Sequence, residues 1–78
     1  MKPIAFLIGN QYQEMIAGYK ISDDFLGMAF TSEAFLAYRF KSINQAKIVL
    51  EKIVKLDKSE LIVVPLFDLG DKLAVPWP

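Results

Sequence analysis

The sequence of 78 residues contains neither histidine nor cysteine. These two side chains carry most of the nucleophilic, acid–base and metal chemistry that proteins perform near neutral pH. Without cysteine there is no disulfide framework, and without clusters of cysteine and histidine there is no structural zinc site. We therefore expect a protein that is not an enzyme and holds no metal or cofactor. The lack of cysteine also fits a reducing compartment such as the cytoplasm.

Other residues that carry chemistry are sparse. The four glycines lie nine or more positions apart, so no glycine-rich phosphate loop is expected. The five serine and threonine hydroxyls have no histidine to activate them, and Ser42 already fits a helix cap. The acidic groupings Asp23–Asp24 and Asp68/Asp71 lie in segments of turn composition, where aspartate commonly bonds to the backbone.

Long hydrophobic runs are absent as well. The longest extends from Leu61 to Phe67 and is interrupted by Pro65, whereas a membrane helix needs about 20 apolar residues. The apolar stretch Ile4–Ile8 is too short for the core of a signal peptide, which has about 7–15 residues. We expect no membrane association and a cytoplasmic location.

What the chain has in abundance is hydrophobic residues, which make up 54% of it. A domain of about 60 residues buries only about 60% of the surface that its unfolded chain exposes. A single domain spanning 1–78 therefore has more apolar surface than it can easily hide. We expect part of that surface to form an interface, with a homodimer as the natural form.

The formal net charge is zero, but the charges are unevenly distributed. Residues 39–58 carry six basic and two acidic side chains, a balance of +4, and the segments on either side are each at −2. Aromatic and basic residues alternate from Tyr38 to Lys41, a pattern that suits base stacking. A solvated basic face is the simpler interpretation, with Tyr38 and Phe40 facing the helix as core. The residues of a nucleic-acid site would be Arg39, Lys41, Lys47, Lys52 and Lys55.

The most regular element is a helix over 43–56. Ser42 fits the N-cap of a capping box, in which Gln45 reaches back to the amide of Ser42. Ile48 falls on the charged side of this helix, where water is expected. The apolar stripe repeats at helical spacing: Ala46, Val49, Leu50, Ile53 and Leu56.

Strand-like patterns account for most of the rest. The expected fold is α+β, in the order β-β-(β)-β-α-β, with a small antiparallel sheet of about four strands packed on the one helix. Residues 25–36 fit either a strand or a short helical turn. A bulge is predicted near Gly18 in the segment 11–21, and Pro65 indicates an edge or a bulge in its strand. The extended segments are expected at 3–8, 11–21, 25–30, 35–40 and 60–69, followed by a short tail at 73–77.

Three features favour protein binding. Ile48 lies among charged residues, the strand at 60–69 is apolar on both faces, and Trp77 lies close to the C-terminus. Each also has a simple structural explanation, because isolated exposed apolar residues are common and a terminal tryptophan can cover a core. The candidate residues for a partner or dimer interface are Ile48, Lys52, Lys55, Phe67, Val75 and Trp77.

The segment from Ala37 to Ala46 has the pattern A-x-x-F-x-S-x-x-x-A. It resembles a pattern in small uncharacterised accessory proteins of bacteriophages and prophages. The resemblance implies that Ala37 and Phe40 pack under the helix, that Ser42 caps it and that Ala46 lies against the sheet. It also implies an inhibitor that blocks a bacterial host protein, including proteins of anti-phage defence. A nucleic-acid-binding regulator and a structural assembly subunit remain the alternatives.

Overall fold

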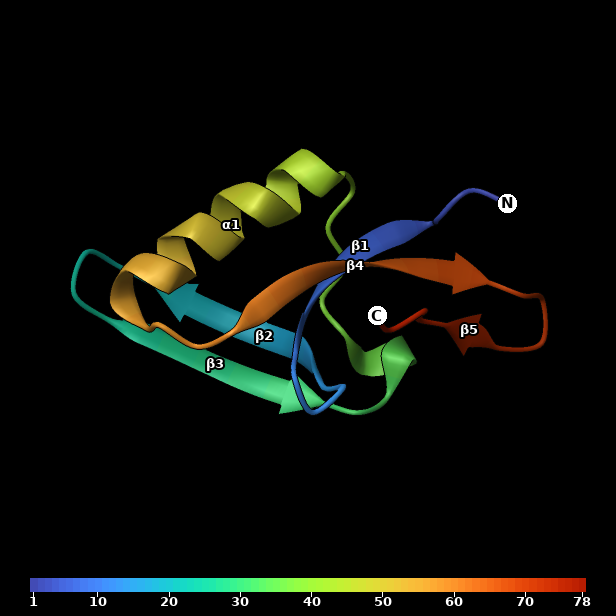
Figure 1. Cartoon of the computed structure of the whole chain (residues 1–78), viewed down its shortest axis with the longest axis horizontal. Coiled ribbons are helices and arrows are strands. Elements are labelled where there is room, and N and C mark those ends of the chain that lie inside the picture. Colours follow the sequence, from blue (N-terminus) through green and yellow to red (C-terminus); the bar gives the residue numbers. More distant parts are fainter.

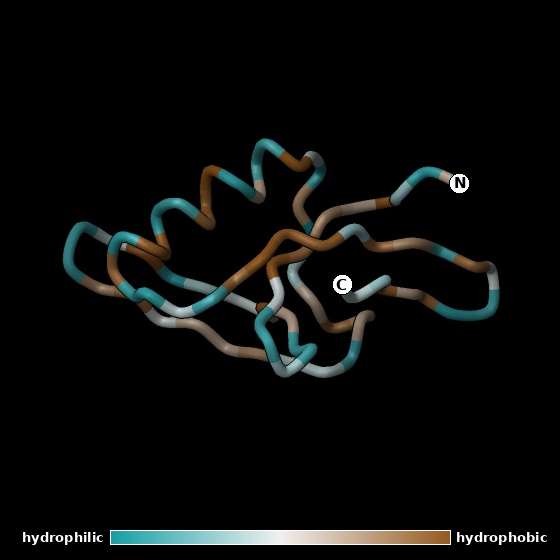
Figure 2. Tube along the Cα trace, viewed as in Figure 1, coloured by the Kyte–Doolittle hydropathy of each residue, from teal (hydrophilic) through white to brown (hydrophobic).

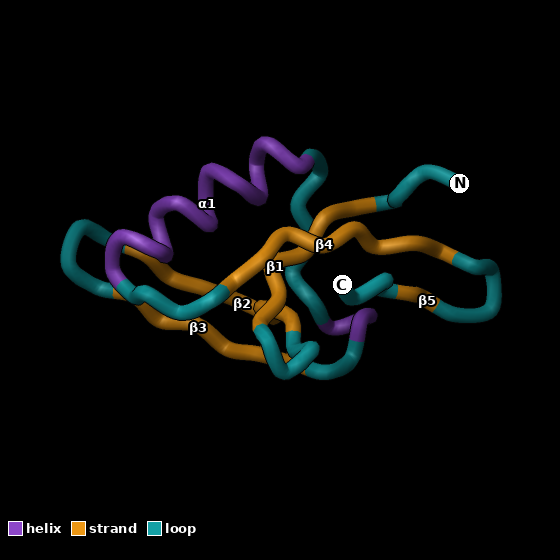
Figure 3. The backbone as a smooth tube through the Cα atoms, viewed as in Figure 1, coloured by secondary structure: helices purple, strands orange, loops and turns teal.

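The computed structural model describes all residues from Met1 to Pro78 and has an α+β architecture. Five antiparallel strands form one curled sheet in the order β3-β2-β1-β4-β5, and a single α-helix covers part of it (Figures 1 and 3). The predicted class and helix are confirmed, while the sheet has one strand more than expected. The elements are β1 Ala5–Asn10, β2 Met15–Ile21, β3 Leu26–Thr31, the 3-10 turn η1 Ala34–Leu36, α1 Ile43–Leu56, β4 Leu61–Asp68 and β5 Leu73–Ala74.

The sheet is split between β1 and β2. These strands pair only at Gly9 and Met15, next to their hairpin, and then diverge. The segment 38–40 fills the gap: Phe6 and Phe40 exchange two backbone hydrogen bonds of 2.9 and 2.8 Å, and the amide of Tyr38 donates to the carbonyl of Ile16 at 2.8 Å. The predicted extended segment at 35–40 is therefore a short bridge between strands, preceded by η1, and not a strand of its own.

Two clusters of buried side chains lie on opposite faces of the sheet. The first, which we call the helix cluster, lies under α1. The second, the tail cluster, lies under η1 and the C-terminal segment. Figures 1 and 2 show α1 on one side of β1 and β4 and η1 with the C-terminal segment on the other. The buried members of the helix cluster are Ile8, Ile16, Phe40, Ala46, Ile53 and Leu61. Those of the tail cluster are Ala5, Leu7, Met15, Ala37, Val64 and Leu66.

The alternation predicted for the strands explains this arrangement. Side chains at alternate positions point to opposite faces of a sheet, and both β1 and β4 send apolar residues to both clusters. Phe40 and Ala46 lie under α1, as the sequence pattern implied. Ala37 does not, because it lies in the tail cluster on the other face. Ala37 and Phe40 are three positions apart, and an odd offset along extended backbone sets two side chains on opposite faces.

The helix begins and ends where the sequence predicted. The Ser42 hydroxyl accepts a hydrogen bond from the amide of Gln45 at 3.2 Å. The reciprocal bond is displaced by one residue, since Gln45 Oε1 accepts from the amide of Lys41 at 3.1 Å and not from that of Ser42. Both ends of the capping arrangement still satisfy free amides near the helix start.

The bulge predicted in the segment 11–21 is present, whereas the strand of Pro65 is neither an edge strand nor bulged, because β4 lies between β1 and β5 with an unbroken register to β1. In β2 the pairing with β3 shifts by one residue between Ile16 and Gly18, which is a bulge. In β4, Pro65 pairs in register with Phe6. The backbone groups of Phe6 point to Phe40 on the other side of β1, so those of Pro65 point to the outer edge of β4. The missing amide hydrogen of this proline therefore costs no bond to β1.

The C-terminal tail is part of the fold. Leu73, Val75 and Trp77 all pack against the tail cluster. A side-chain carbon placed on Gly9 would lie only 2.5 Å from Cζ3 of Trp77, so the indole ring rests directly on the backbone of β1. The absence of a side chain at Gly9 makes this close approach possible.

We expect Gly9→Ala to destabilise the protein by about 1–3 kcal/mol, because the added methyl forces Trp77 out of its place. Chemical denaturation followed by circular dichroism measures the effect. In a Trp77→Ala background the same glycine substitution should lose most of its cost, since the clashing ring is gone. Equal costs in both backgrounds would contradict this packing.

Candidate binding groove beside the helix

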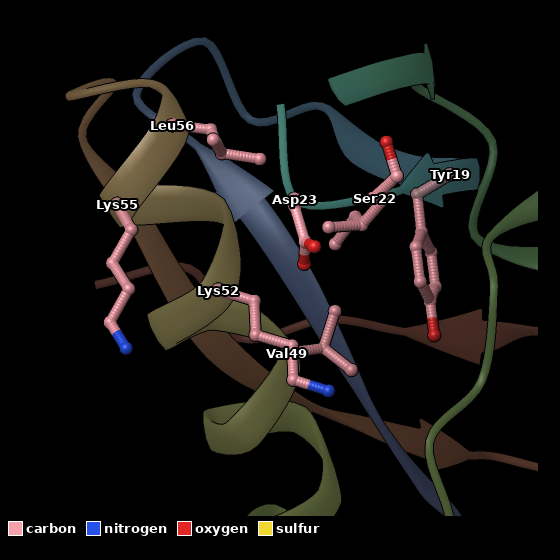
Figure 4. Close-up of a pocket in the computed structure, with 8 residues that line it drawn as sticks. Tyr19, Ser22, Asp23, Val49, Lys52, Lys55 and Leu56 are labelled. Atoms are coloured by element: carbon pink, nitrogen blue, oxygen red, sulfur yellow. The ribbon is translucent and has the colours of Figure 1, made fainter. Parts of the chain in front are cut away.

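Two hollows lie next to each other along one side of α1, and we call them together the helix groove. They have volumes of about 440 and 450 Å³, and both are lined by Tyr19 of β2 and Val49 of α1. The first lies near the C-terminal half of the helix, where Lys52 and Leu56 point towards Ser22 and Asp23 and Lys55 extends away from them at the border (Figure 4). The second lies near its N-terminal half and is bounded by the segment 38–41.

Three aromatic rings lie together in this region. Tyr38 packs against Phe40 with ring centroids 5.0 Å apart, and Tyr19 meets Tyr38 edge-on at 5.2 Å. Phe40 is buried, whereas Tyr38 is 44% exposed. The prediction that both residues of this pair face the helix as core is therefore correct for Phe40 and wrong for Tyr38, whose ring lines the groove.

Positive charge surrounds the aromatic surface. Arg39 and Lys41 line one hollow, and Lys52 and Lys55 line the other. Asp23 is the one carboxylate among the lining residues, so four cations face one anion. Such a combination of apolar floor and basic rim is complementary to a partner that presents apolar and acidic groups together.

Burial raises the pKa of the Tyr19 hydroxyl above its ordinary value of 10.0, and the neighbouring Tyr38 raises it further. The neutral phenol is therefore the form that the fold favours. In this form the Tyr19 hydroxyl can both donate and accept hydrogen bonds at the groove.

The structure divides the predicted interface residues into two groups. Ile48, Lys52 and Lys55 all line the helix groove, and Ile48 is 54% exposed. Val75 and Trp77 pack on the tail cluster instead. Phe67 lines a separate shallow apolar hollow together with Met1, Leu69, Ala74, Val75 and Pro76.

Four of the five residues of the nucleic-acid alternative also meet at the groove: Arg39, Lys41, Lys52 and Lys55. Lys47 is exposed on α1 and lines neither hollow. The tertiary structure thus places most of the basic segment 39–58 on one surface, which it shares with Ile48.

Sequence reasoning missed the contribution of β2 to this surface. Tyr19, Ile21, Ser22 and Asp23 form the wall opposite α1. The only local signal was the position of Tyr19 in an alternating strand, which gives the face of the side chain but not the element across from it. No group of three or more histidine, cysteine, aspartate or glutamate side chains comes together as a metal site.

No helix has the length and apolar character that a membrane span requires. No family model, curated protein or solved structure matches this chain. The helix groove therefore has to be interpreted from its own chemistry, which is that of an aromatic surface with a basic border.

The raised pKa of Tyr19 predicts a stability change in alkaline solution. Because the folded state holds this proton more tightly than the unfolded state, the contribution is complete below pH 10.0 and is lost as the pH rises through the folded-state pKa. Denaturant unfolding across this range should show a smaller alkaline loss in Tyr19→Phe than in the wild type. Tyr12→Phe, at an exposed position, is the control for losing one hydroxyl, and identical pH profiles of the two variants would contradict the prediction.

Proposed function

We propose that this chain is a non-enzymatic binding module that recognises a protein partner through the helix groove. The observation that carries the proposal is the meeting of Ile48, Tyr38 and four basic side chains on one concave surface. Half-exposed apolar and aromatic side chains supply contact energy, and the cations at the rim favour an acidic partner surface.

The partner that we propose is a bacterial protein in the host cytoplasm, which the chain blocks by covering a functional surface. This part of the proposal rests on the resemblance of the segment 37–46 to phage accessory proteins. A steric inhibitor needs no catalytic group, and it needs one surface whose shape and charge match its target. The helix groove supplies an apolar centre and a charged rim, which is the usual composition of such a surface.

A second function is favoured by the same basic residues. Tyr19 and Tyr38 offer aromatic rings next to Arg39 and Lys41, an arrangement that single-stranded nucleic acids use for stacking and phosphate contacts. The groove also contains Asp23 and has only four cations. We therefore rank nucleic acid below a protein partner.

The protein-partner proposal is tested by a matched pair of helix variants. Ile48→Glu places a carboxylate inside the groove, whereas Val54→Glu places the same group at an exposed helix position that lines neither hollow. We expect Ile48→Glu to weaken capture of a specific protein from bacterial lysate by about tenfold or more, as for a central interface residue. Val54→Glu should retain it.

Both variants should keep the wild-type circular dichroism spectrum, because both positions are solvent-exposed. The proposal requires a protein that the wild type and Val54→Glu capture and that Ile48→Glu does not. If no such protein is found, the helix groove is not the binding surface. Capture of the same protein by the wild type, Ile48→Glu and Val54→Glu alike would also exclude the helix groove as the binding surface.

The two functions differ in their response to salt. With a protein partner as its target, the chain should give no stable complex with single-stranded DNA or RNA oligonucleotides in a gel shift at low ionic strength. A complex whose affinity falls steeply as salt is raised would instead support the nucleic-acid alternative, because phosphate contacts release counterions. In that case the double variant Lys52→Glu/Lys55→Glu should lose binding more strongly than Lys47→Glu.

A further inference from the structure

The two edges of the sheet differ in how they are protected. β3 pairs with β2 on one side and with no strand on the other. An unpaired edge strand presents free amides and carbonyls to other chains, and proteins usually protect it with proline, charged side chains or a covering segment. Neither proline nor any charged residue occurs within β3, whose sequence is LGMAFT.

The opposite edge has the protection that β3 lacks. β5 covers the end of β4 by pairing with Phe67 and Asp68. Pro65 lies further along the same edge with its nitrogen facing outward, so a second strand would find no donor there and would meet the proline ring. The outer side of β4 is thus covered at one end and interrupted by a proline, whereas β3 has neither form of protection.

The ladder between β2 and β3 determines which groups β3 offers. The amide of Ser22 donates to the carbonyl of Phe25, so these two residues form a hydrogen-bonded pair. Bonding alternates along an antiparallel ladder, so the backbone amides and carbonyls of Leu26 and Met28 point away from β2. We call residues with this backbone direction outward-facing. Beyond the bulge the carbonyl of Ile16 bonds to Tyr38, away from its register partner Phe30. The backbone amide and carbonyl of Phe30 therefore point away from β2 as well.

We propose that a second copy of this chain pairs with β3 in antiparallel orientation, joining two sheets of five strands into one. The two-fold axis passes through Met28, so that Met28 faces its own counterpart and Leu26 faces Phe30 of the other copy. This register pairs all three outward-facing residues of each strand. A register shifted by one residue would set outward-facing positions against inward-facing ones and lose the bonds.

Charge and exposure support the same occupant. Since β3 has no charge, two antiparallel copies place no like charges opposite each other within the strand, and the nearest like-charged pair, Asp23 and Glu33, lies beyond its ends. Phe25 and Phe30, near opposite ends of β3, are 53% and 37% exposed. The antiparallel arrangement sets Phe25 of one copy opposite Thr31 of the other, which brings apolar surface together at both ends of the paired strands.

The dimer has a consequence for the helix groove. A two-fold axis perpendicular to the sheet keeps corresponding faces on the same side, so both copies of α1 would cover one face of the joined sheet. Leu26 and Met28 pack towards the helix cluster on that face. Two grooves then open on one surface, and if they bind a partner as proposed above, a repetitive or dimeric partner would gain avidity. The pairing does not rest on the proposed function, because no residue of β3 lines the groove.

The proposal is tested by the mass in solution and by a matched pair of edge variants. Light scattering of the wild type at high micromolar concentration should give twice the 8.8 kDa of one chain. Phe30→Pro and Phe30→Ala both remove the phenyl ring, but only the proline removes the outward amide. We expect dimerisation of Phe30→Pro to be at least about tenfold weaker than that of Phe30→Ala, since two symmetry-related bonds are lost.

Both variants should remain folded, because the amide of Phe30 makes no bond to β2 in this register and Pro65 occupies an equivalent outward position on β4. Circular dichroism and thermal unfolding check this directly. A folded wild type that stays at 8.8 kDa overturns the proposal. A dimer that weakens equally in both Phe30 variants, or one that only Ile48→Glu disrupts, overturns it as well.

The register has a separate test, since the chain has no cysteine of its own. Met28→Cys should form a disulfide-linked dimer under mild oxidation, because the two-fold axis places the two Cα atoms at about 5.5 Å. Ala29→Cys would meet its own counterpart only in a register moved along the strand. Faster crosslinking of Ala29→Cys than of Met28→Cys overturns the proposed axis.

Discussion

The pair of backbone hydrogen bonds between Phe6 and Phe40 is the constraint on which most of this structure depends. It holds the segment 38–40 in the split between β1 and β2, where the amide of Tyr38 also finds a carbonyl. From there Phe40 reaches the helix cluster, and the chain enters α1 from a fixed point. The same link sets Tyr38 beside Tyr19 and leaves Arg39 and Lys41 at the rim of the helix groove. The same backbone link therefore positions both a residue of the helix cluster and residues of the helix groove.

Burial on both faces of the sheet is how a short and very hydrophobic chain accommodates its apolar residues. The helix cluster occupies one face and the tail cluster the other, with Trp77 lying on Gly9 as part of the second. This arrangement uses the C-terminal residues within the fold. The apolar side chains that remain in solvent include Ile48 on α1, Phe25 and Phe30 near the ends of β3, and Phe35 and Leu36 on η1. Because Val75 and Trp77 pack against the tail cluster, the exposed residues of α1 and of the β3 edge are stronger candidates for an interface than the tail.

The helix groove and the β3 edge offer different kinds of recognition. The groove presents side chains, an aromatic floor with cations around it, and its selectivity would come from shape and charge. The edge presents backbone groups, which any extended strand can pair with, and its selectivity would come from register and from the absence of charge. Because the two surfaces share no residue, each can be altered while the other is left intact.

The sequence by itself determined the helix with its Ser42 cap and the bulge in β2, since these depend on residues within a few positions of one another, and its alternating and helical patterns indicated the α+β class. It did not reveal that β1 and β2 separate, that Ala37 and Phe40 lie on opposite faces, or that Val75 and Trp77 belong to the core. Only the tertiary structure brought Tyr19 to Val49 and Lys52 and so created the groove. The physical reason is that periodicity fixes which face a side chain occupies, whereas long-range packing decides what lies opposite that face.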